Sequence, residues 1–258
     1  MIHKGPKKSL GQNFLIDQNI ARKIVASLDL GPRDLVLEIG PGRGILTRLM
    51  ARDAGQVLAL EKDASLAFAL EKNSKILMIN MDALHLDWRK LDRWPGIKIA
   101  GNLPYNIAQA LLWDLVGQCR KFSKAVFMIQ KEVAQRIASA PGGKEYGMLS
   151  VWIQSHATVK LLFNVPPSVF RPRPKIFSSV IALSPESEEK FFFDQDQLSQ
   201  TLKIMFQNRR KQLGRILKTY WNKRKKDILA LCHLDPARRP EQLSPQEFHL
   251  LSRCIFYD

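Results

Sequence analysis

The sequence predicts an α/β fold in which an open sheet of seven strands is followed by a small all-α domain at the carboxyl end. Short apolar runs alternate with helix-like segments between residues 35 and 183, which is typical of sheets built from strand–helix units. A glycine-rich turn follows the first of these runs. Beyond residue 184, a charged linker leads into segments with helical periodicity only. We therefore expect two domains, residues 1–184 and residues 185–258.

The chain carries a strong excess of positive charge. Among its 258 residues, Lys and Arg total 40 while Asp and Glu total 24, which gives a net charge of +16 and a pI of about 9.9. A protein this basic associates with polyanions. Nucleic acid is the leading candidate partner, and an anionic membrane surface is the lesser one.

The sequence shows no targeting signal and no disulfide framework. No apolar run approaches the roughly 20 residues that a membrane-spanning helix needs, and the first residues lack the apolar core of a secretion signal. The three cysteines, Cys119, Cys232 and Cys254, have neither disulfide-framework nor metal-site spacing. We therefore expect a cytoplasmic protein without a bound metal, whose cysteines are packing or surface thiols.

The first segment, residues 7–17, changes from basic to apolar along its length. The triplet at residues 14–16 is too apolar for a free tail, so we expect this arm to fold back onto the sheet domain. In that position Asn13 is able to hydrogen-bond a ligand. A helix is expected next, over residues 19–28, with a cap near Asp17.

The first buried strand, residues 35–39, ends in the glycine-rich turn Gly40-Pro41-Gly42-Arg43-Gly44. Glycines let the backbone approach a ligand closely, and the helix that follows presents free N–H groups and its positive dipole end. A dinucleotide-binding turn has the spacing G-x-G-x-x-G. Here the third glycine comes one residue early, and the acidic Glu38 precedes the turn. This pattern favours S-adenosylmethionine over a dinucleotide pyrophosphate.

Two acidic residues follow the next two strands, residues 56–60 and 76–80. Glu61 comes about 20 residues after the glycines, where a carboxylate is able to accept hydrogen bonds from both hydroxyls of a ribose. Asp82 follows the third strand, where a carboxylate is able to accept a hydrogen bond from an adenine amino group. Each acid alone is better explained as a solvated helix cap. Their occurrence after successive strands favours a nucleoside site.

The sequence Asn102-Leu103-Pro104-Tyr105, hereafter the tetrapeptide, follows a fourth strand at residues 97–100 and precedes a helix-like segment. In open α/β sheets, ligands bind at the carboxyl ends of the strands. Pro104 has no N–H, but its carbonyl is able to accept a hydrogen bond. This oxygen and the Asn102 side chain then form two acceptors beside the Tyr105 ring, a set that suits a planar ring bearing an amino group. A simple strand-to-helix turn explains the same residues.

Three further strands complete the predicted sheet, at residues 124–130, 159–163 and 176–183. Helices are expected at residues 131–138 and, after a turn, up to Gln154. A proline-rich basic loop, residues 166–175, lies between the last two strands. We expect its one aromatic residue, Phe170, to lie over the face of a base opposite Tyr105. The alternative is a rigid connector.

The carboxyl-terminal part contains a long run of positive charge. Between Lys203 and Lys226 there are ten basic residues and no acidic one, with aromatic residues interleaved. A charge run of this kind is often a solvated helix face. In a protein that is already basic, the complete sign bias favours an RNA or DNA phosphate surface. The last segment, residues 236–257, is predicted to be a short helical pair, with a helix start at Ser244.

Taken together, these motifs resemble those of the ribosomal RNA adenine N6,N6-dimethyltransferase family that acts on the small subunit. The resemblance covers nearly the whole chain in the same order, through Ser9-Leu10-Gly11-Gln12-Asn13-Phe14-Leu15, residues 38–44, Glu61, Asp82-Ala83, the tetrapeptide, Tyr146-Gly147 and residues 170–175. It implies a Rossmann-like class I methyltransferase domain with a seven-stranded mixed sheet. It also implies S-adenosyl-L-methionine as cofactor and ribosomal RNA within a small-subunit precursor as partner.

The resemblance implies the site residues as well. Those expected at the S-adenosylmethionine site are Asn13, Leu15, Gly40, Glu61, Asp82 and Asn102. Those expected to act on the target adenine are Asn102, Pro104, Tyr105 and Phe170. The cations expected to contact RNA are Lys7, Lys8, Arg171, Arg173, Arg209, Arg210, Lys211 and Arg215. In one departure, Phe177 stands where the family usually has an aspartate, so a hydrogen bond to that carboxylate is not expected here.

Several rival interpretations stay open. An enzyme of the erythromycin-resistance type modifies an adenine of the large subunit with the same tetrapeptide, although the arm at residues 9–15 favours the small-subunit family. A ribosome-assembly factor with little catalysis belongs to another class, and the cofactor-site residues argue against it. A DNA adenine methylase would more often have a second proline in the tetrapeptide, and the glycine spacing disfavours a nicotinamide dehydrogenase. We expect a monomer, since no extensive subunit contact is indicated.

Overall fold

The computed structural model of the chain describes residues 12–67, 73–186, 193–220 and 225–256. The chain divides into two compact units. The first contains residues 1–134 and 158–185, and the second contains residues 135–157 and 186–258. The division into a methyltransferase domain and an RNA-contacting domain near residue 184 stays a prediction about function.

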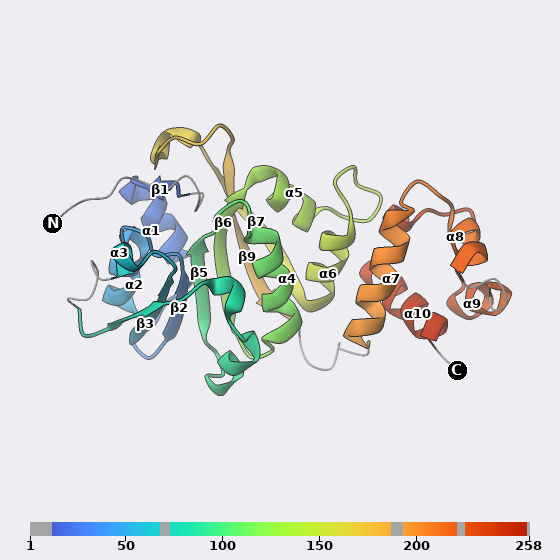
Figure 1. Cartoon of the computed structure of the whole chain (residues 1–258), viewed down its shortest axis with the longest axis horizontal. Coiled ribbons are helices and arrows are strands. Elements are labelled where there is room, and N and C mark those ends of the chain that lie inside the picture. Colours follow the sequence, from blue (N-terminus) through green and yellow to red (C-terminus); the bar gives the residue numbers. More distant parts are fainter. Residues whose placement is uncertain (1–11, 68–72, 187–192, 221–224, 257–258) are drawn as a thin grey trace. The chain divides into compact units, whose positions relative to one another are not determined.

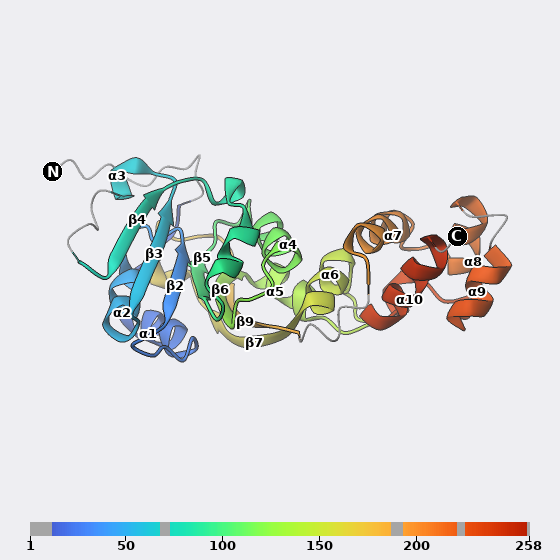
Figure 2. The ribbon, with the colours of Figure 1, turned by 90° about the horizontal axis from the view of Figure 1, so that it is seen from below.

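The first unit is built on a seven-stranded sheet in the order β4-β3-β2-β5-β6-β9-β7. Its strands are β2 (Leu35–Ile39), β3 (Gln56–Glu61), β4 (Ile76–Asn80), β5 (Lys98–Asn102), β6 (Lys124–Gln130), β7 (Ala157–Val165) and β9 (Ser178–Pro185). The strands from β4 to β6 pair in parallel, whereas β9 is antiparallel to β6. Figure 2 shows these strands side by side. The predicted mixed sheet of seven strands is therefore confirmed.

Helices cover the sheet because its strands are apolar on both faces. On one face, α1 (Gln18–Ala26) and α2 (Ile45–Asp53) form a core cluster with the strands, in which Ile24 and Met50 are fully buried together with Val36 of β2. The Asp17 side chain caps α1, as expected, by accepting the N–H groups of its first turn. The remaining helices of this part are α3 (Ala64–Ala67), α4 (Ala108–Gln118) and α5 (Lys131–Ala138), with short 3₁₀ helices η2 (Ala83–His85), η3 (Trp88–Arg93) and η4 (Pro167–Val169).

The arm before α1 pairs with the proline-rich loop. Its strand β1 (Phe14–Leu15) is antiparallel to β8 (Phe170–Arg171), and the Ile16 N–H donates to the Val169 carbonyl at 2.9 Å. Figure 1 shows β1 in the first unit, next to α1. The prediction that this arm folds back onto the sheet domain is confirmed.

The strand order reverses between β2 and β5. The chain runs outward from β2 through β3 to β4 and then returns to β5 on the other side of β2. At such a switch point the loops leave in opposite directions, so a crevice opens at the carboxyl ends of the strands. The glycine-rich turn follows β2, and the tetrapeptide begins at the last residue of β5.

The second unit is helical. Its elements are α6 (Met148–His156), α7 (Gln195–Gln207), α8 (Leu213–Tyr220), α9 (Lys225–Cys232), the 3₁₀ helix η7 (Pro240–Gln242) and α10 (Pro245–Phe256). Within the described ranges, no helix combines the length and the apolar character needed to cross a lipid bilayer.

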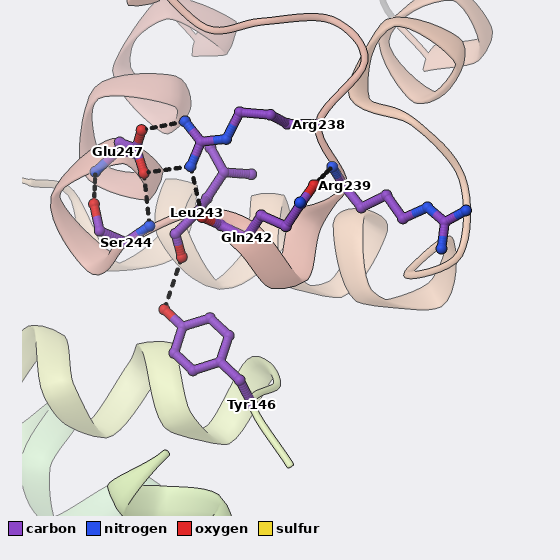
Figure 3. A network of polar contacts seen from close by, with 7 residues as sticks. All are labelled: Tyr146, Arg238, Arg239, Gln242, Leu243, Ser244 and Glu247. Carbon is purple, nitrogen blue, oxygen red and sulfur yellow. Dashed lines mark hydrogen bonds and ion pairs between the residues drawn. The ribbon is translucent and has the colours of Figure 1, made fainter. Parts of the chain in front are cut away.

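A polar network fixes the start of α10 to the segment before α6 (Figure 3). Ser244 and Glu247 form a capping box, with the Ser244 N–H donating to Glu247 Oε2 at 2.8 Å and the Glu247 N–H donating to Ser244 Oγ at 3.2 Å. Arg238 contacts both carboxylate oxygens of Glu247. The buried Tyr146 hydroxyl donates to the Leu243 carbonyl at 2.8 Å. The predicted helix start at Ser244 is confirmed, and Tyr146 has a structural partner.

All three cysteines are buried and free. Burial raises the pKa of the Cys119 thiol to about 12, so this side chain stays protonated at neutral pH and is a poor nucleophile. The cysteines are therefore packing residues.

Candidate active site

A cavity opens at the carboxyl ends of the central strands. The arm, the glycine-rich turn, the segments after β3 and β4, and the tetrapeptide contribute to its wall. The predicted site residues that line it are Asn13, Gly40, Glu61, Asp82, Asn102, Pro104 and Tyr105. Residues from five separate segments of the chain are thus brought together as expected.

Glycine is required where the backbone forms the cavity wall. Gly40 and Gly42 have φ angles of +67° and +56°, in the left-handed region that other residues rarely adopt. A Cβ atom on Gly42 would lie 3.0 Å from the Phe14 ring of the arm. A Cβ atom on Gly101 would lie 2.7 Å from the Ile39 carbonyl oxygen. The turn and the arm therefore approach each other closely only because Gly42 lacks a side chain, and β5 lies close to the end of β2 because Gly101 lacks one.

Glu61, the last residue of β3, presents a fixed carboxylate to the cavity. It is 6% exposed, and its Oε1 and Oε2 accept the N–H groups of Asp63 at 2.8 Å and Gly42 at 3.1 Å. Burial raises the pKa of this carboxyl, and the two backbone hydrogen bonds oppose the rise. Each oxygen still has a lone pair for another donor. The geometry suits two ligand hydroxyls.

Asp82 both caps a helix and lines the cavity. Its Oδ1 accepts the Leu84 N–H at 3.1 Å and so caps η2, which confirms the interpretation of Asp82 as a helix cap. Its Oδ2 lies 2.7 Å from Lys62 Nζ. The hydrogen bond from Lys62 lowers the pKa of Asp82, which keeps the carboxylate charged at neutral pH. A charged acceptor is therefore held in the wall of the cavity.

The arm holds the side chain of Asn102. Its Nδ2 donates to the Asn13 carbonyl oxygen at 2.9 Å. Because this hydrogen bond uses the amide nitrogen, it fixes the amide plane. Among the described residues, Asn102 Oδ1 receives no hydrogen bond. An oriented acceptor oxygen therefore lies at the carboxyl end of β5.

The Pro104 carbonyl is not a free acceptor, and the prediction was wrong on this point. It accepts the N–H groups of Ile107 and Ala108, both at 3.1 Å, where α4 begins. A carbonyl oxygen has two lone pairs, so a third donor has to share one of them. The helix after the tetrapeptide was predicted correctly, but the hydrogen bonds from its first N–H groups to the Pro104 carbonyl were not. A direct role of Pro104 toward a ligand stays a prediction.

Tyr105 lines the cavity with a ring of fixed orientation. Its hydroxyl lies 2.8 Å from Oγ of Ser178, a fully buried residue of β9. Burial raises the pKa of the Tyr105 phenol, and the hydrogen bond to Ser178 opposes the rise. The phenol is therefore neutral at pH 7. An aromatic ring held in this way is a suitable surface for a stacked base.

Two predicted site residues do not line the cavity. Phe170 and Leu15 are 1% and 4% exposed, face each other in the β1–β8 pair and belong to the apolar core cluster. Pairing with the arm buries the ring that the sequence suggested would lie opposite Tyr105. In this conformation Phe170 presents no face to a base. Its role stays a prediction that requires the β1–β8 pair to open.

Comparison with known proteins decides the family. The family model described as "Ribosomal RNA adenine dimethylase" matches residues 3–255. The chain belongs to this adenine dimethylase family. A protein of Maridesulfovibrio salexigens named Ribosomal RNA small subunit methyltransferase A is 46% identical over 254 residues, covering 98% of this chain and 96% of the relative. A protein of the same name from Halothermothrix orenii is 40% identical, and the match covers 99% of this chain and 89% of the relative.

Solved structures share the architecture of this adenine dimethylase. A dimethyladenosine transferase from Plasmodium falciparum has a TM-score of 0.79 at 26% identity, covering 92% of this chain and 95% of that one. The 23S rRNA methyltransferase ErmE has a TM-score of 0.72 at 23% identity, and the match covers 94% of this chain and 99% of ErmE. The second likeness shows the fold alone. The predicted Rossmann-like methyltransferase fold is confirmed.

The cations that we expect the adenine dimethylase to use for RNA differ in their surroundings. Lys7 and Lys8 lie outside the described residues. Arg209 is engaged within the second unit, because its Nε lies 2.5 Å from Glu241 Oε2 and its Nη2 donates to the Lys144 carbonyl at 2.8 Å. The exposed side chains are those of Arg171, Arg173, Arg210, Lys211 and Arg215. Arg171 also donates to the Phe170 carbonyl, at 3.0 Å, so the other four exposed side chains are better suited to phosphate contacts than Arg209 or Arg171.

Sequence reasoning missed several residues that line the cavity of this dimethylase. Met81 and Leu84 are 37% and 39% exposed although apolar, and they flank the Asp82-Ala83 pair. Their position after a strand was a usable signal, since ligand sites combine apolar walls with a few polar groups. The contact of Lys62 with Asp82 depends on the pairing of β3 with β4 and has no local signal.

Proposed function

We propose that this chain is an S-adenosyl-L-methionine-dependent enzyme that converts adenines of small-subunit ribosomal RNA to N6,N6-dimethyladenine during ribosome biogenesis in the cytoplasm. The observation that carries this proposal is the Asn102 amide, which Asn13 fixes at 2.9 Å in the same cavity as the buried Glu61 carboxylate. One cavity then offers groups for a nucleoside cofactor and an acceptor for a purine amino group. Membership of the family supports the reaction, and the names of the relatives support the substrate.

The residues of the cavity fit S-adenosylmethionine. Glu61 would accept the ribose hydroxyls, because its oxygens are fixed by backbone N–H groups and keep lone pairs. The Asp82 carboxylate, which the contact with Lys62 keeps charged, would accept a hydrogen bond from the amino group of the cofactor adenine. Gly40 and Gly42 supply a wall without Cβ atoms, which a methionine moiety is able to approach. Two carboxylate acceptors beside a wall without side chains suit a nucleoside.

Asn102 is the group that prepares the acceptor nitrogen. The amino nitrogen of adenine is a poor nucleophile because its lone pair is delocalised into the ring. A hydrogen bond from one amino N–H to Asn102 Oδ1 favours a more tetrahedral nitrogen and directs its lone pair out of the ring plane. When bound, the cofactor supplies a methyl group on a positively charged sulfur. Positioning and electrostatics then suffice, and the nitrogen loses its proton to water.

The occupied Pro104 carbonyl bears on double methylation. A monomethylated amino group keeps only one N–H. Since the Pro104 oxygen already accepts the N–H groups of Ile107 and Ala108, Asn102 Oδ1 is the acceptor with spare capacity in both rounds. No second acceptor has to yield to the first methyl group. A single fixed amide is therefore compatible with dimethylation.

Methyl transfer from radiolabelled S-adenosylmethionine tests this function. The purified chain is incubated with immature small ribosomal subunits, mature small subunits, large subunits and protein-free ribosomal RNA. We expect label in the immature small subunits and N6,N6-dimethyladenosine in their nucleoside digest. Reverse-transcription arrest then maps the modified positions.

Each rival function has its own result in this assay. Label confined to the RNA of large subunits would assign the erythromycin-resistance type of activity. Tight binding to immature small subunits without any label, in the presence of bound cofactor, would assign an assembly factor. Either result would overturn the proposed function.

A further inference from the structure

The loop between β8 and β9 exposes an aromatic ring that the proposed reaction does not use. Phe177 is 51% exposed, and the adjacent Ile176 is 43% exposed. Exposing two large apolar side chains in succession is unfavourable in water, and contact with another molecule would remove this cost. Both residues precede β9 directly, at Ser178.

The surroundings of this ring are cationic. Lys131 Nζ lies 5.9 Å from the centroid of the Phe177 ring, and Arg173 and Lys175 are exposed in the same loop. Among the described residues, neither Arg173 nor Lys175 has a salt-bridge or hydrogen-bond partner. Their charges are therefore available to an anionic ligand. An exposed aromatic ring near one cation, in a loop that carries two more, has the composition of a single-stranded nucleic-acid site.

The main chain holds Phe177 in place beside the tetrapeptide. Its carbonyl oxygen accepts the Lys131 N–H at 3.0 Å, and the next residue, Ser178, is hydrogen-bonded to the Tyr105 hydroxyl at 2.8 Å. The ring is thus one residue away from the group that orients Tyr105. A side chain on a fixed main chain loses less conformational freedom when a ligand stacks on it.

We propose that Phe177 binds an unpaired RNA base next to the target adenine in sequence. The base stacks on the exposed face of the ring, while Lys131, Arg173 and Lys175 neutralise the flanking phosphates. This inference rests on the proposed function, because it assigns a second nucleotide of the same RNA substrate. A protein partner is a poorer match, since Phe177 lies near Lys131 and in a loop whose charged residues, Arg173 and Lys175, are both cations.

Phe177→Ala and Phe177→Tyr test the stacking. The full chain is titrated into a short fluorescein-labelled single-stranded RNA of mixed sequence, and the dissociation constant is measured by anisotropy. We expect Phe177→Ala to weaken binding about tenfold, within the range found for one base on an aromatic ring, and Phe177→Tyr to bind like the wild type. Phe177→Leu, which keeps apolar bulk without a ring, is expected to resemble alanine. Leu161→Ala, at a 45% exposed apolar position of β7, is the matched control and should bind like the wild type.

Salt dependence separates the ring from the cations. Phe177→Ala should leave the slope of log K against log salt unchanged, whereas replacing Arg173 and Lys175 together should flatten it. On immature small subunits, Phe177→Ala should raise the KM for RNA and leave the KM for S-adenosylmethionine unchanged. Binding of Phe177→Ala that equals the wild type, or binding of Phe177→Leu that equals Phe177→Tyr, would overturn the inference. A wild-type chain that binds RNA but transfers no methyl group would instead overturn the proposed function.

Discussion

Replacing Asn102 by alanine removes the acceptor oxygen and leaves the rest of the cavity in place. The variant loses the 2.9 Å hydrogen bond to the Asn13 carbonyl, which is worth about 0.5–1.5 kcal/mol. The arm keeps its β1–β8 pairing and the Ile16–Val169 hydrogen bond. We therefore expect cofactor affinity to fall by at most about tenfold.

Methyl transfer should fall much further. Removing one preorganised hydrogen-bonding group at a reacting centre costs on the order of 10²–10³ in rate. Asn102 Oδ1 is the acceptor with spare capacity, because the Pro104 carbonyl already accepts two N–H groups. We expect a loss of about 10²-fold or more in the single-turnover rate of methyl transfer. Asn102→Asp should be impaired as well, since a carboxylate cannot donate to the Asn13 carbonyl and is repelled by it.

The assay combines two measurements on each variant. Calorimetric titration with S-adenosylhomocysteine gives cofactor affinity, and radiolabelled transfer to immature small subunits gives the rate. Asn164→Ala is the matched control, because it also loses an amide hydrogen bond, the one from Ser179 at 2.7 Å, but lies in β7 and does not line the cavity. A rate for Asn102→Ala within tenfold of this control, with cofactor and RNA bound, would refute the acceptor role.

Three further predictions concern stability and RNA affinity. Burial raises the pKa of Glu38 from 4.5 to about 8, so between these pH values the folded state keeps a proton that the unfolded state has lost. The free energy of unfolding therefore falls as the pH rises from 4.5 to 8. Glu38→Gln should melt at a higher temperature than the wild type at pH 8 but not at pH 4.5. Burial lowers the pKa of His249 from 6.5 to about 4, so between these pH values the unfolded state binds a proton that the folded state does not. The free energy of unfolding therefore falls as the pH drops from 6.5 to 4. The melting temperature of His249→Gln should not show this fall. Exchanging the exposed Arg210 and Lys211 for alanine should reduce the slope of log K against log salt by about 1–2 for RNA, and an unchanged slope would remove both from the interface.

The sheet was predictable because each of its strands is a short apolar run bounded by turn residues. The position of β9 between β6 and β7 was not, since strand order depends on pairing between distant segments. The cavity residues Glu61, Asp82 and Asn102 were predictable from the rule that parallel strands bring their carboxyl ends together. At these three positions, the local sequence pattern and the topology of the sheet predict the same location.

The errors have a common physical origin in contacts with other segments of the chain, distant or adjacent. Phe170 was expected at the cavity, but a strand formed by the arm, more than 150 positions earlier in the chain, buries its ring. Arg209 belongs to a run of positive charge, yet it pairs with Glu241, 32 positions later. The Pro104 carbonyl is used by the helix that follows it. Residue type alone does not show which polar atoms the fold has already used.

A crystal structure of the chain with an S-adenosylmethionine analogue and adenosine tests the central claim most directly. We expect Glu61 at the ribose of the analogue and Asn102 Oδ1 within hydrogen-bonding distance of the adenosine amino group. The amino nitrogen should lie about 3–3.5 Å from the position of the methyl carbon. A structure in which Asn102 faces away from that position, or in which the adenosine binds with its amino group elsewhere, would contradict the mechanism.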